Sequence, residues 1–227
     1  MQRLSGLALV LTVGCSAANS AAVLEHHGAQ ITRDSLGDVV KVQFRTPALP
    51  FTDSELTHFR NFPKLRDLSL HGTAVTDSGL VQLAGMKLNR LSLPDHLMTD
   101  VGLKHYLKAS NLKRRLNLGR WSITDQGLAH VKGLTMLDEL DLYPGWQITD
   151  AGMVLLKEMT SLKDLALPSQ VTDAGLIHVK EMSHLQKLVL PSRITDSGLI
   201  HIKEMTRLRD LILPSQITDT GLIHVKE

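Results

Sequence analysis

The leucines of this chain recur in a spacing that predicts short β-strands. Between residues 185 and 205, Leu185, Leu188 and Leu190 follow a Leu-x-x-Leu-x-Leu pattern that alternates at period two. Pro191 comes next and cannot donate a backbone hydrogen bond to a continuing strand ladder. The same spacing occurs at Leu65/Leu68/Leu70, Leu88/Leu91/Leu93, Leu137/Leu140/Leu142, Leu162/Leu165/Leu167 and Leu208/Leu211/Leu213, and with one additional residue at Leu112/Leu116/Leu118.

Each strand pattern is followed by a helix signal. In the same stretch, Thr195 and Asp196 are good N-cap residues, and Leu199, Ile202 and Met205 follow at helical spacing, which predicts a helix of about three turns. The Thr-Asp pair recurs at intervals of 23–25 residues, beginning at Thr52, Thr76, Thr99, Thr124, Thr149, Thr172, Thr195 and Thr218. A fixed period of this length predicts a solenoid of repeated strand–helix units.

This pattern resembles the helix-bearing leucine-rich repeats, in particular the cysteine-containing subclass and the arrays of exported bacterial proteins. The resemblance covers residues 30–227 and implies an α/β solenoid, with a curved parallel sheet on the concave face and helices on the convex face. Two departures limit what it implies. The segment between strand and Ile-Thr-Asp reads Pro-Ser-Gln or Pro-Ser-Arg where the subclass commonly has Cys, and no F-box-like segment precedes the array. The ubiquitin-ligase adaptor role of some relatives is therefore not expected.

Residues 1–15 are predicted to be a signal peptide. Arg3 is followed by an apolar stretch, residues 4–13, that is too short to span a bilayer, and small residues lead to Cys15. This resembles a bacterial lipoprotein signal, with Thr12 where that pattern more often has Leu, and it implies lipidation of Cys15. The alternative is an ordinary secretory signal cut between residues 16 and 22. Both interpretations predict export, either to the cell envelope with a lipid anchor or as a periplasmic or secreted protein.

The remaining chain is expected to contain three parts. Residues 16–28 form a tether, residues 29–46 form an N-terminal capping strand region, with Val39, Val42 and Phe44 at strand spacing, and residues 47–227 form the array with its last repeat incomplete. Three explanations are open for that unfinished end: a truncated coding sequence, packing against another subunit, or fraying. Self-association through this end is one consequence.

Composition and residue types argue against several kinds of chemistry. The formal charge is +2 and aromatic residues make up 4% of the chain, so binding of nucleic acid is not expected. Histidines recur near the helix starts, at His58, His105, His130, His178, His201 and His224. Helices packed about 8–10 Å apart cannot easily bring two of them to one zinc ion, which needs nitrogens about 2 Å away. We expect no metal, no cofactor and no catalytic residues, and we assign the repeated aspartates to helix capping.

Columns of equivalent strand positions supply the candidate binding surface. One column reads Lys41, Asp67, Arg90, Arg115, Glu139, Asp164, Lys187 and Asp210, and we interpret it as a self-paired charge ladder in preference to a charged ligand site. The next column becomes apolar at Ala166, Val189 and Ile212. Those three residues either form an apolar contact stripe or reflect the strand preference of β-branched residues.

Two strand-to-helix loops of adjacent repeats contain the two tryptophans of the chain and predict a contact cluster. Arg120 and Trp121 lie in one loop, and Tyr143 and Trp146 lie in the corresponding loop of the next repeat. These residue types often dominate interface energies, so we expect them side by side on one rim. The alternative is that each tryptophan folds back and fills space under its own longer loop.

The sequence thus predicts a non-enzymatic scaffold that binds a protein or another macromolecule. A structural or truncated repeat fragment without a dedicated ligand is the main alternative, and a hydrolase that uses the histidines is a third hypothesis.

Overall fold

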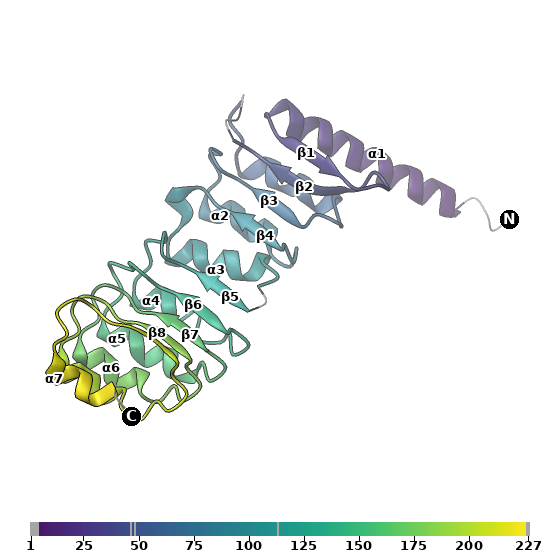
Figure 1. Ribbon diagram of the computed structural model, residues 1–227. Coiled ribbons are helices and arrows are strands. Elements are labelled where there is room, and N and C mark those ends of the chain that lie inside the picture. The colour runs from purple at the N-terminus through teal and green to yellow at the C-terminus, as the bar shows by residue number, and fades with distance from the viewer. Residues whose placement is uncertain (1–4, 46, 48, 113, 226–227) are drawn as a thin grey trace. The chain divides into compact units, whose positions relative to one another are not determined.

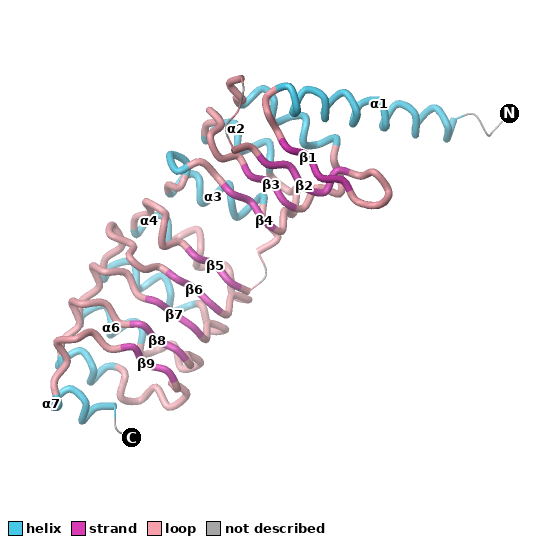
Figure 2. The backbone as a smooth tube through the Cα atoms, turned by 45° about the horizontal axis from the view of Figure 1, so that its top comes forward, coloured by secondary structure: helices cyan, strands magenta, loops and turns pink. Residues whose placement is uncertain are grey.

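The structure is a computed structural model that describes residues 5–45, 47, 49–112 and 114–225 (Figure 1). The chain forms two compact units. The first contains residues up to 97 together with 101–111, and the second contains 98–100 and the residues from 112 onward. Within each unit the strands lie side by side in one sheet, and the short helices lie along one side of it (Figure 2).

The first unit has a four-stranded sheet in the order β1-β2-β3-β4, in which only the β1–β2 pair is antiparallel. Its elements, with η for a 3-10 helix, are α1 (Ser5–His26), β1 (Gln30–Arg33), β2 (Val39–Gln43), η1 (Asp53–Asn61), β3 (Asp67–Ser69), α2 (Asp77–Leu80), η2 (Val81–Leu83), β4 (Arg90–Ser92), η3 (Asp95–Leu97) and α3 (Asp100–Ala109).

The second unit has a five-stranded, entirely parallel sheet in the order β5-β6-β7-β8-β9. Its elements are β5 (Arg115–Asn117), α4 (Asp125–Leu128), β6 (Glu139–Asp141), α5 (Asp150–Met153), η4 (Val154–Glu158), β7 (Asp164–Ala166), α6 (Asp173–Val179), β8 (Lys187–Val189), η5 (Asp196–His201), β9 (Asp210–Ile212), α7 (Asp219–Leu222) and η6 (Ile223–Val225).

The leucine pattern places the core as predicted. The central leucines of neighbouring strands pair in register, as in Leu140↔Leu165 and Leu165↔Leu188, and these side chains are buried between sheet and helices. The predicted three-turn helix after Thr195 is wrong, because η5 is a six-residue 3-10 helix. Among the described elements, α2, α4, α5 and α7 are each a single four-residue α-helical turn, and a 3-10 turn continues α2, α5 and α7. A 23-residue repeat with a strand and two connections leaves little chain for a longer helix.

Residues 16–28, expected as a tether, are mostly helical and pack on the first unit. Ser20, Ala21 and Leu24 of α1 are buried. The Ser20 hydroxyl lies 3.0 Å from His58 Nδ1 and accepts a hydrogen bond of 2.8 Å from Asn61 Nδ2. The tether was inferred from the predicted lipid anchor at Cys15, whereas these buried residues lie on a helix that packs on η1.

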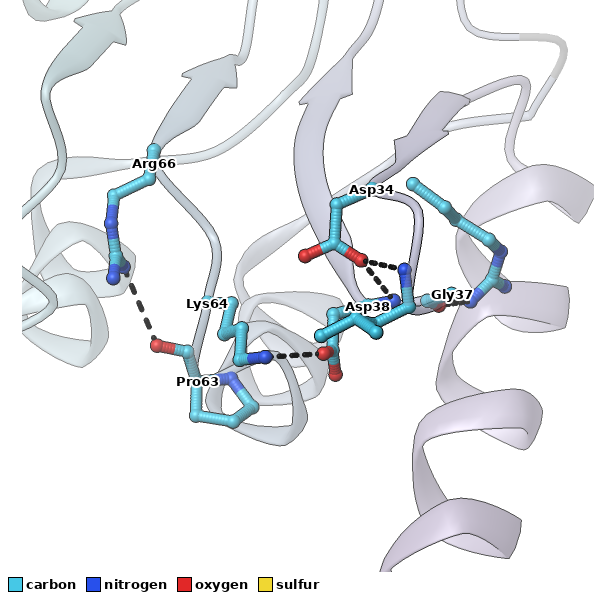
Figure 3. Close-up of polar contacts among 8 residues, drawn as sticks. Asp34, Gly37, Asp38, Pro63, Lys64 and Arg66 are labelled. Atoms are coloured by element: carbon cyan, nitrogen blue, oxygen red, sulfur yellow. Dashed lines mark hydrogen bonds and ion pairs between the residues drawn. The ribbon is translucent and has the colours of Figure 1, made fainter.

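The predicted capping strand region is a β-hairpin. Asp34 Oδ1 accepts hydrogen bonds from the N–H groups of Leu36 and Asp38, and Gly37 adopts a φ of +83° in the tight turn (Figure 3). Lys64 donates to Asp38 Oδ2 at 2.6 Å, and this hydrogen bond raises the pKa of the Lys64 amine. The pair ties the hairpin to the segment that leads into β3.

A repeated hydrogen-bond pair joins consecutive repeats, and we call it the Asp–Thr rung. The carboxylate of one Thr-Asp pair accepts two hydrogen bonds from the threonine of the next: the backbone N–H donates to Oδ1 at 2.7–2.9 Å, and the hydroxyl donates to Oδ2 at 2.5–2.7 Å. The described rungs are Asp53–Thr76 in the first unit and Asp100–Thr124, Asp125–Thr149, Asp150–Thr172, Asp173–Thr195 and Asp196–Thr218 in the second.

The rung corrects the assignment of the aspartates to helix capping. The threonine is the N-cap, because its hydroxyl accepts a hydrogen bond from a backbone N–H of its own helix, as Thr172 does from Ala174. The aspartate instead reaches the neighbouring repeat. In the first unit, Asp77 Oδ1 is buried and has no hydrogen-bond partner among the described residues.

The glycine of the Thr-Asp-x-Gly motif makes room for this rung. A Cβ placed on Gly127, Gly152, Gly175, Gly198 or Gly221 would overlap the Oδ1 atom of the preceding repeat's aspartate. Gly79 stands in the same relation to Asp53. Thr, Asp and Gly are therefore three parts of one contact between adjacent repeats.

The first copy of the motif has Glu55 in place of the glycine, and the rung explains the exchange. Within the described chain no aspartate from a preceding repeat reaches Thr52, and Glu55 Oε2 accepts from both the Thr52 N–H at 2.7 Å and the Thr52 hydroxyl at 2.9 Å. Partial burial opposes ionisation, but hydrogen bonds from Ser54 and Thr52 outweigh it and lower the pKa of the Glu55 carboxyl.

Gly175→Ala is predicted to lower the free energy of unfolding by about 1–3 kcal/mol, because the new methyl group would overlap Asp150 and Val171. The helix propensity of alanine alone would act in the opposite direction, by about 1 kcal/mol. Gly133→Ala is the matched control, since a Cβ there meets nothing within 4 Å. Urea unfolding curves measure both variants; equal stabilities would contradict the role of the glycine.

Stability is also predicted to fall in acid through Asp196. The Thr218 hydroxyl, and after it the Thr218 N–H, hold the pKa of this carboxyl below its ordinary value of 3.8. A depressed folded-state pKa gives stability that is present above the unfolded-state pKa and is lost as the pH falls through the folded-state value.

The unfolding midpoints of the wild type and Asp196→Asn are therefore expected to differ at pH 7 and to converge as the pH is lowered below about 4. Urea titrations at a series of pH values test this. Midpoint curves that stay parallel down to pH 2.5 would show that ionised Asp196 does not stabilise the fold.

Candidate functional site

The sheet of the second unit has an open face, which we define by the outward residues of β5 to β9. Registered pairs Asp141↔Ala166, Ala166↔Val189 and Val189↔Ile212 place the predicted stripe residues in one row. Ala166 and Val189 are half-buried, and 49% of Ile212 is exposed. Leu165 and Leu188 point to the opposite side and are buried, so these strands keep one core face and one outward face.

The part of the charged column that belongs to β5–β9 also lies in register on the open face, but the predicted ladder of ion pairs is wrong in most places. Arg115 Nε lies 3.1 Å from Glu139 Oε2. Among the described residues, no other neighbouring pair of this column comes within 4.0 Å. Strand pairing fixes the backbones about 4.8 Å apart, and long exposed side chains can still point away from each other into water.

A shallow hollow of about 190 Å³ lies over β6, β7 and β8. Asp141 is held at its edge, because its Oδ2 accepts a hydrogen bond of 2.8 Å from Asn117 Nδ2 and its Oδ1 accepts one of 3.0 Å from the Tyr143 N–H. The side chains that line the hollow are Glu139, Asp141, Asp164, Ala166, Lys187 and Val189. The hollow therefore combines acidic groups with one cation and an apolar floor.

The two long loops form an aromatic rim, which we define as Arg120, Trp121, Tyr143 and Trp146. A Cβ on Gly119 would overlap the Tyr143 carbonyl oxygen, so the two loops lie against each other. Tyr143 is 54% exposed and Trp146 is 67% exposed, whereas Trp121 is half-buried. Folding back under the loop thus does not describe Trp146.

A backbone hydrogen bond holds the second rim loop against the following repeat. The Tyr143–Pro144 peptide bond is cis, and Gly145 has a φ of +46°. Ser169 N–H donates to the Pro144 carbonyl at 2.7 Å, which joins this loop to the following repeat. The exposed Tyr143 and Trp146 side chains are carried on a backbone that is hydrogen-bonded to the following repeat.

A second exposed row was missed by the sequence reasoning. On the helical side of the second unit, the residue after the motif's Gly-Leu or Gly-Met is repeatedly aliphatic: Val154, Ile177, Ile200 and Ile223 are 37%, 41%, 54% and 66% exposed. The signal was present in the sequence as a Val or Ile at one fixed motif position. It was overlooked because those residues also suit a helix interior.

The histidines do not assemble into a metal centre. Within the part of the chain that the structure describes, no three His, Cys, Asp or Glu side chains are placed to hold a metal ion. His58 contacts Ser20, and His96 Nε2 lies 2.9 Å from the Val75 carbonyl oxygen. Among the same residues, no helix is both long enough and apolar enough to cross a membrane.

The comparison with solved structures finds leucine-rich-repeat architecture. An internalin of Listeria monocytogenes superposes with a TM-score of 0.52 at 20% sequence identity, covering 92% of this chain and 65% of that chain. The fold is a leucine-rich-repeat solenoid. The yeast complex of Rad7 and Elc1 also matches, with a TM-score of 0.43 and 16% identity over 77% of this chain and 57% of that chain. No family model and no curated protein matches the sequence.

This chain spans less than two thirds of the length of each of these two solved chains. The 20% identity with the internalin relates the fold alone and leaves the site residues to be judged from this chain. The row Ala166, Val189 and Ile212 and the aromatic rim lie in neighbouring repeats of the second unit. They give the leucine-rich-repeat sheet an outward surface with exposed aromatic and aliphatic groups.

Proposed function

We propose that this leucine-rich-repeat chain is a non-enzymatic scaffold that binds a protein through the open face of its second unit and the aromatic rim. The observation that carries the proposal is the exposure of Tyr143 and Trp146 in the loop after β6, the strand that pairs with β7 and so adjoins the row Ala166, Val189 and Ile212. Large aromatic side chains are the most frequent anchors of protein interfaces, and solvent exposure of two of them in one loop costs free energy without a partner.

The composition of the face suits a folded or extended protein segment. Aliphatic residues lie on β7 to β9, and charged residues from the neighbouring column line the same strands. An apolar centre with polar groups around it is the usual arrangement of a specific protein interface. Enzymatic chemistry lacks a comparable basis, because the hollow is shallow and brings no nucleophile next to a base.

A photo-crosslinking amino acid placed at Val189 or Trp146 is predicted to capture one defined protein in the native host, whereas the same probe at Ile177 on the helical side should not. Mass spectrometry of the crosslinked product names the partner. Equal capture from Ile177 would move the binding surface to the helical side and contradict the proposal.

With that partner purified, Tyr143→Ala combined with Trp146→Ala should weaken binding at least tenfold without changing the unfolding midpoint, since both side chains are largely exposed. Met136→Ala is the matched control, because Met136 is 75% exposed in a different loop. Isothermal titration calorimetry compares the three proteins.

We further propose export and lipid anchoring at Cys15, supported by the apolar stretch before it and the small residues around it. Cys15 lies within α1, but its side chain is outside the described part of the structure, as are residues 1–4. Cleavage before Cys15 would leave Ser20, Ala21 and Leu24 in place, so the packing of α1 on η1 is compatible with processing.

Metabolic labelling with an alkyne-bearing fatty acid is predicted to mark the wild-type protein and not Cys15→Ser. The labelled protein should also fractionate with membranes. If an unlabelled mature chain begins between residues 16 and 22, the ordinary secretory signal is the correct alternative.

A further inference from the structure

The hollow over β6, β7 and β8 lies in the interior of the sheet of the second unit and has a mostly acidic lining. β5 pairs with β6 and β8 pairs with β9, so strands flank the hollow on both sides. Its charged lining residues are Glu139, Asp141, Asp164 and Lys187. Three carboxylates therefore share the hollow with one ammonium group.

One of the three carboxylates is already paired with a cation. Arg115 Nε lies 3.1 Å from Glu139 Oε2. Asp141 instead accepts its hydrogen bonds from two uncharged donors, the Asn117 side chain and the Tyr143 N–H. These bonds hold the Asp141 carboxylate in place without neutralising it, so its negative charge stays available to a bound molecule.

Asp164 is the carboxylate that the fold leaves without a partner. Asp164 is half-buried, and its side chain makes no hydrogen bond or ion pair with the described residues. Lys187 lies opposite Asp164 in the sheet register, but its ammonium group is not within 4.0 Å of the Asp164 carboxylate. Covering such a carboxylate costs free energy unless the covering molecule supplies a cation or a hydrogen-bond donor.

The groups around these carboxylates suit a cationic side chain with an apolar stem. Tyr143 follows Asp141 by two residues, and Tyr143 and Trp146 are 54% and 67% exposed. The faces of exposed aromatic rings attract cations. Ala166 and Val189 line the same hollow and can contact the methylene groups of a lysine or arginine.

We propose that the protein segment bound at the open face is basic and inserts the side chain of an arginine or lysine into the hollow, with aliphatic residues beside it. This inference rests on the proposed protein-binding function and names the chemistry of the partner. Asp141 lies opposite Ala166, two residues beyond Asp164 on β7, so the two carboxylates occupy diagonal positions on adjacent strands. Such positions are about 7–8 Å apart, a spacing that the planar, five-donor guanidinium of an arginine can bridge.

Other molecules fit the hollow less well. An acidic or wholly apolar segment would cover Asp164 without compensating its charge. A metal ion is not favoured either, because Ala166 and Val189 contribute only apolar side chains to the lining. Among the residues that the structure describes, no three His, Cys, Asp or Glu side chains are placed to hold such an ion.

A random peptide library displayed on phage tests the inference without a known partner. The library is selected on the purified full-length protein and, in parallel, on Asp164→Asn, which keeps the shape of the side chain and removes its charge. Selection on the wild type is expected to enrich peptides that contain an arginine or lysine beside aliphatic residues. Selection on Asp164→Asn should not enrich them.

The tightest selected peptide is then synthesised with its basic residue and with the uncharged analogue, citrulline for arginine or acetyl-lysine for lysine. Isothermal titration calorimetry is expected to show that Asp164→Asn binds the basic peptide about tenfold or more weakly than the wild type does. The uncharged peptide should bind both proteins weakly and almost equally, because the charge pair is already absent.

Glu181→Gln is the matched control, since it removes an exposed carboxylate outside the hollow, and it should bind the basic peptide like the wild type. Circular dichroism melts check that both variants keep the fold. Equal affinity of the basic peptide for the wild type and Asp164→Asn would overturn the inference.

Photo-crosslinking from Val189 separates this inference from the proposed function. Selected peptides that crosslink from Val189 but contain no basic residue would overturn the basic segment and leave protein binding at the open face intact. If no selected peptide crosslinks from Val189, both the basic segment and the proposed binding surface are rejected.

Discussion

The Asp–Thr rung is the interaction on which the repeat geometry depends. One carboxylate takes both the N–H and the hydroxyl of the next threonine, and that threonine at the same time caps its own helix. A shift of one residue between neighbours would break both bonds, so the rung fixes the same register that the paired leucines fix on the sheet. The motif is conserved within the chain from repeat to repeat because its three residues share one contact.

The rung also explains why the helical segments are so short and the loops before them vary in length. It fixes the start of the helical segment against the preceding repeat, so a single α-helical turn is enough to carry a buried Leu or Met, as in α4 and α5. Helices of this length are not stable alone and depend on such tertiary contacts. The chain between strand and threonine is then free to change in length, from five residues after β7 to seven in the aromatic-rim loop after β6, without changing the stack.

The strands and the buried leucines could be predicted from the repeated sequence pattern. The contacts that depend on the direction of a side chain were mostly missed. Strand register followed from the leucine spacing, because a period of two assigns every residue to a face. The charge ladder failed because flexible side chains need not follow the spacing of their backbones. The aspartates were assigned to capping because that explanation is local, whereas the true partner lies 22–24 residues away. The burial of Ser20 and Leu24 likewise depends on η1, which is distant in sequence.

Two ends of the Asp–Thr series show that the contact is an exchange of specific donors and acceptors. At Thr52, Glu55 supplies from within the repeat the carboxylate that other threonines receive from a neighbour, and it does so at the position where a glycine would otherwise be needed. A glutamate fits there because no aspartate occupies that space among the described residues. At Asp219 the converse holds: the acceptor is present, and no described residue supplies the donors. Both observations follow from the same pairing, in which a threonine N–H and hydroxyl meet one carboxylate, whether that carboxylate comes from the same repeat or from the preceding one.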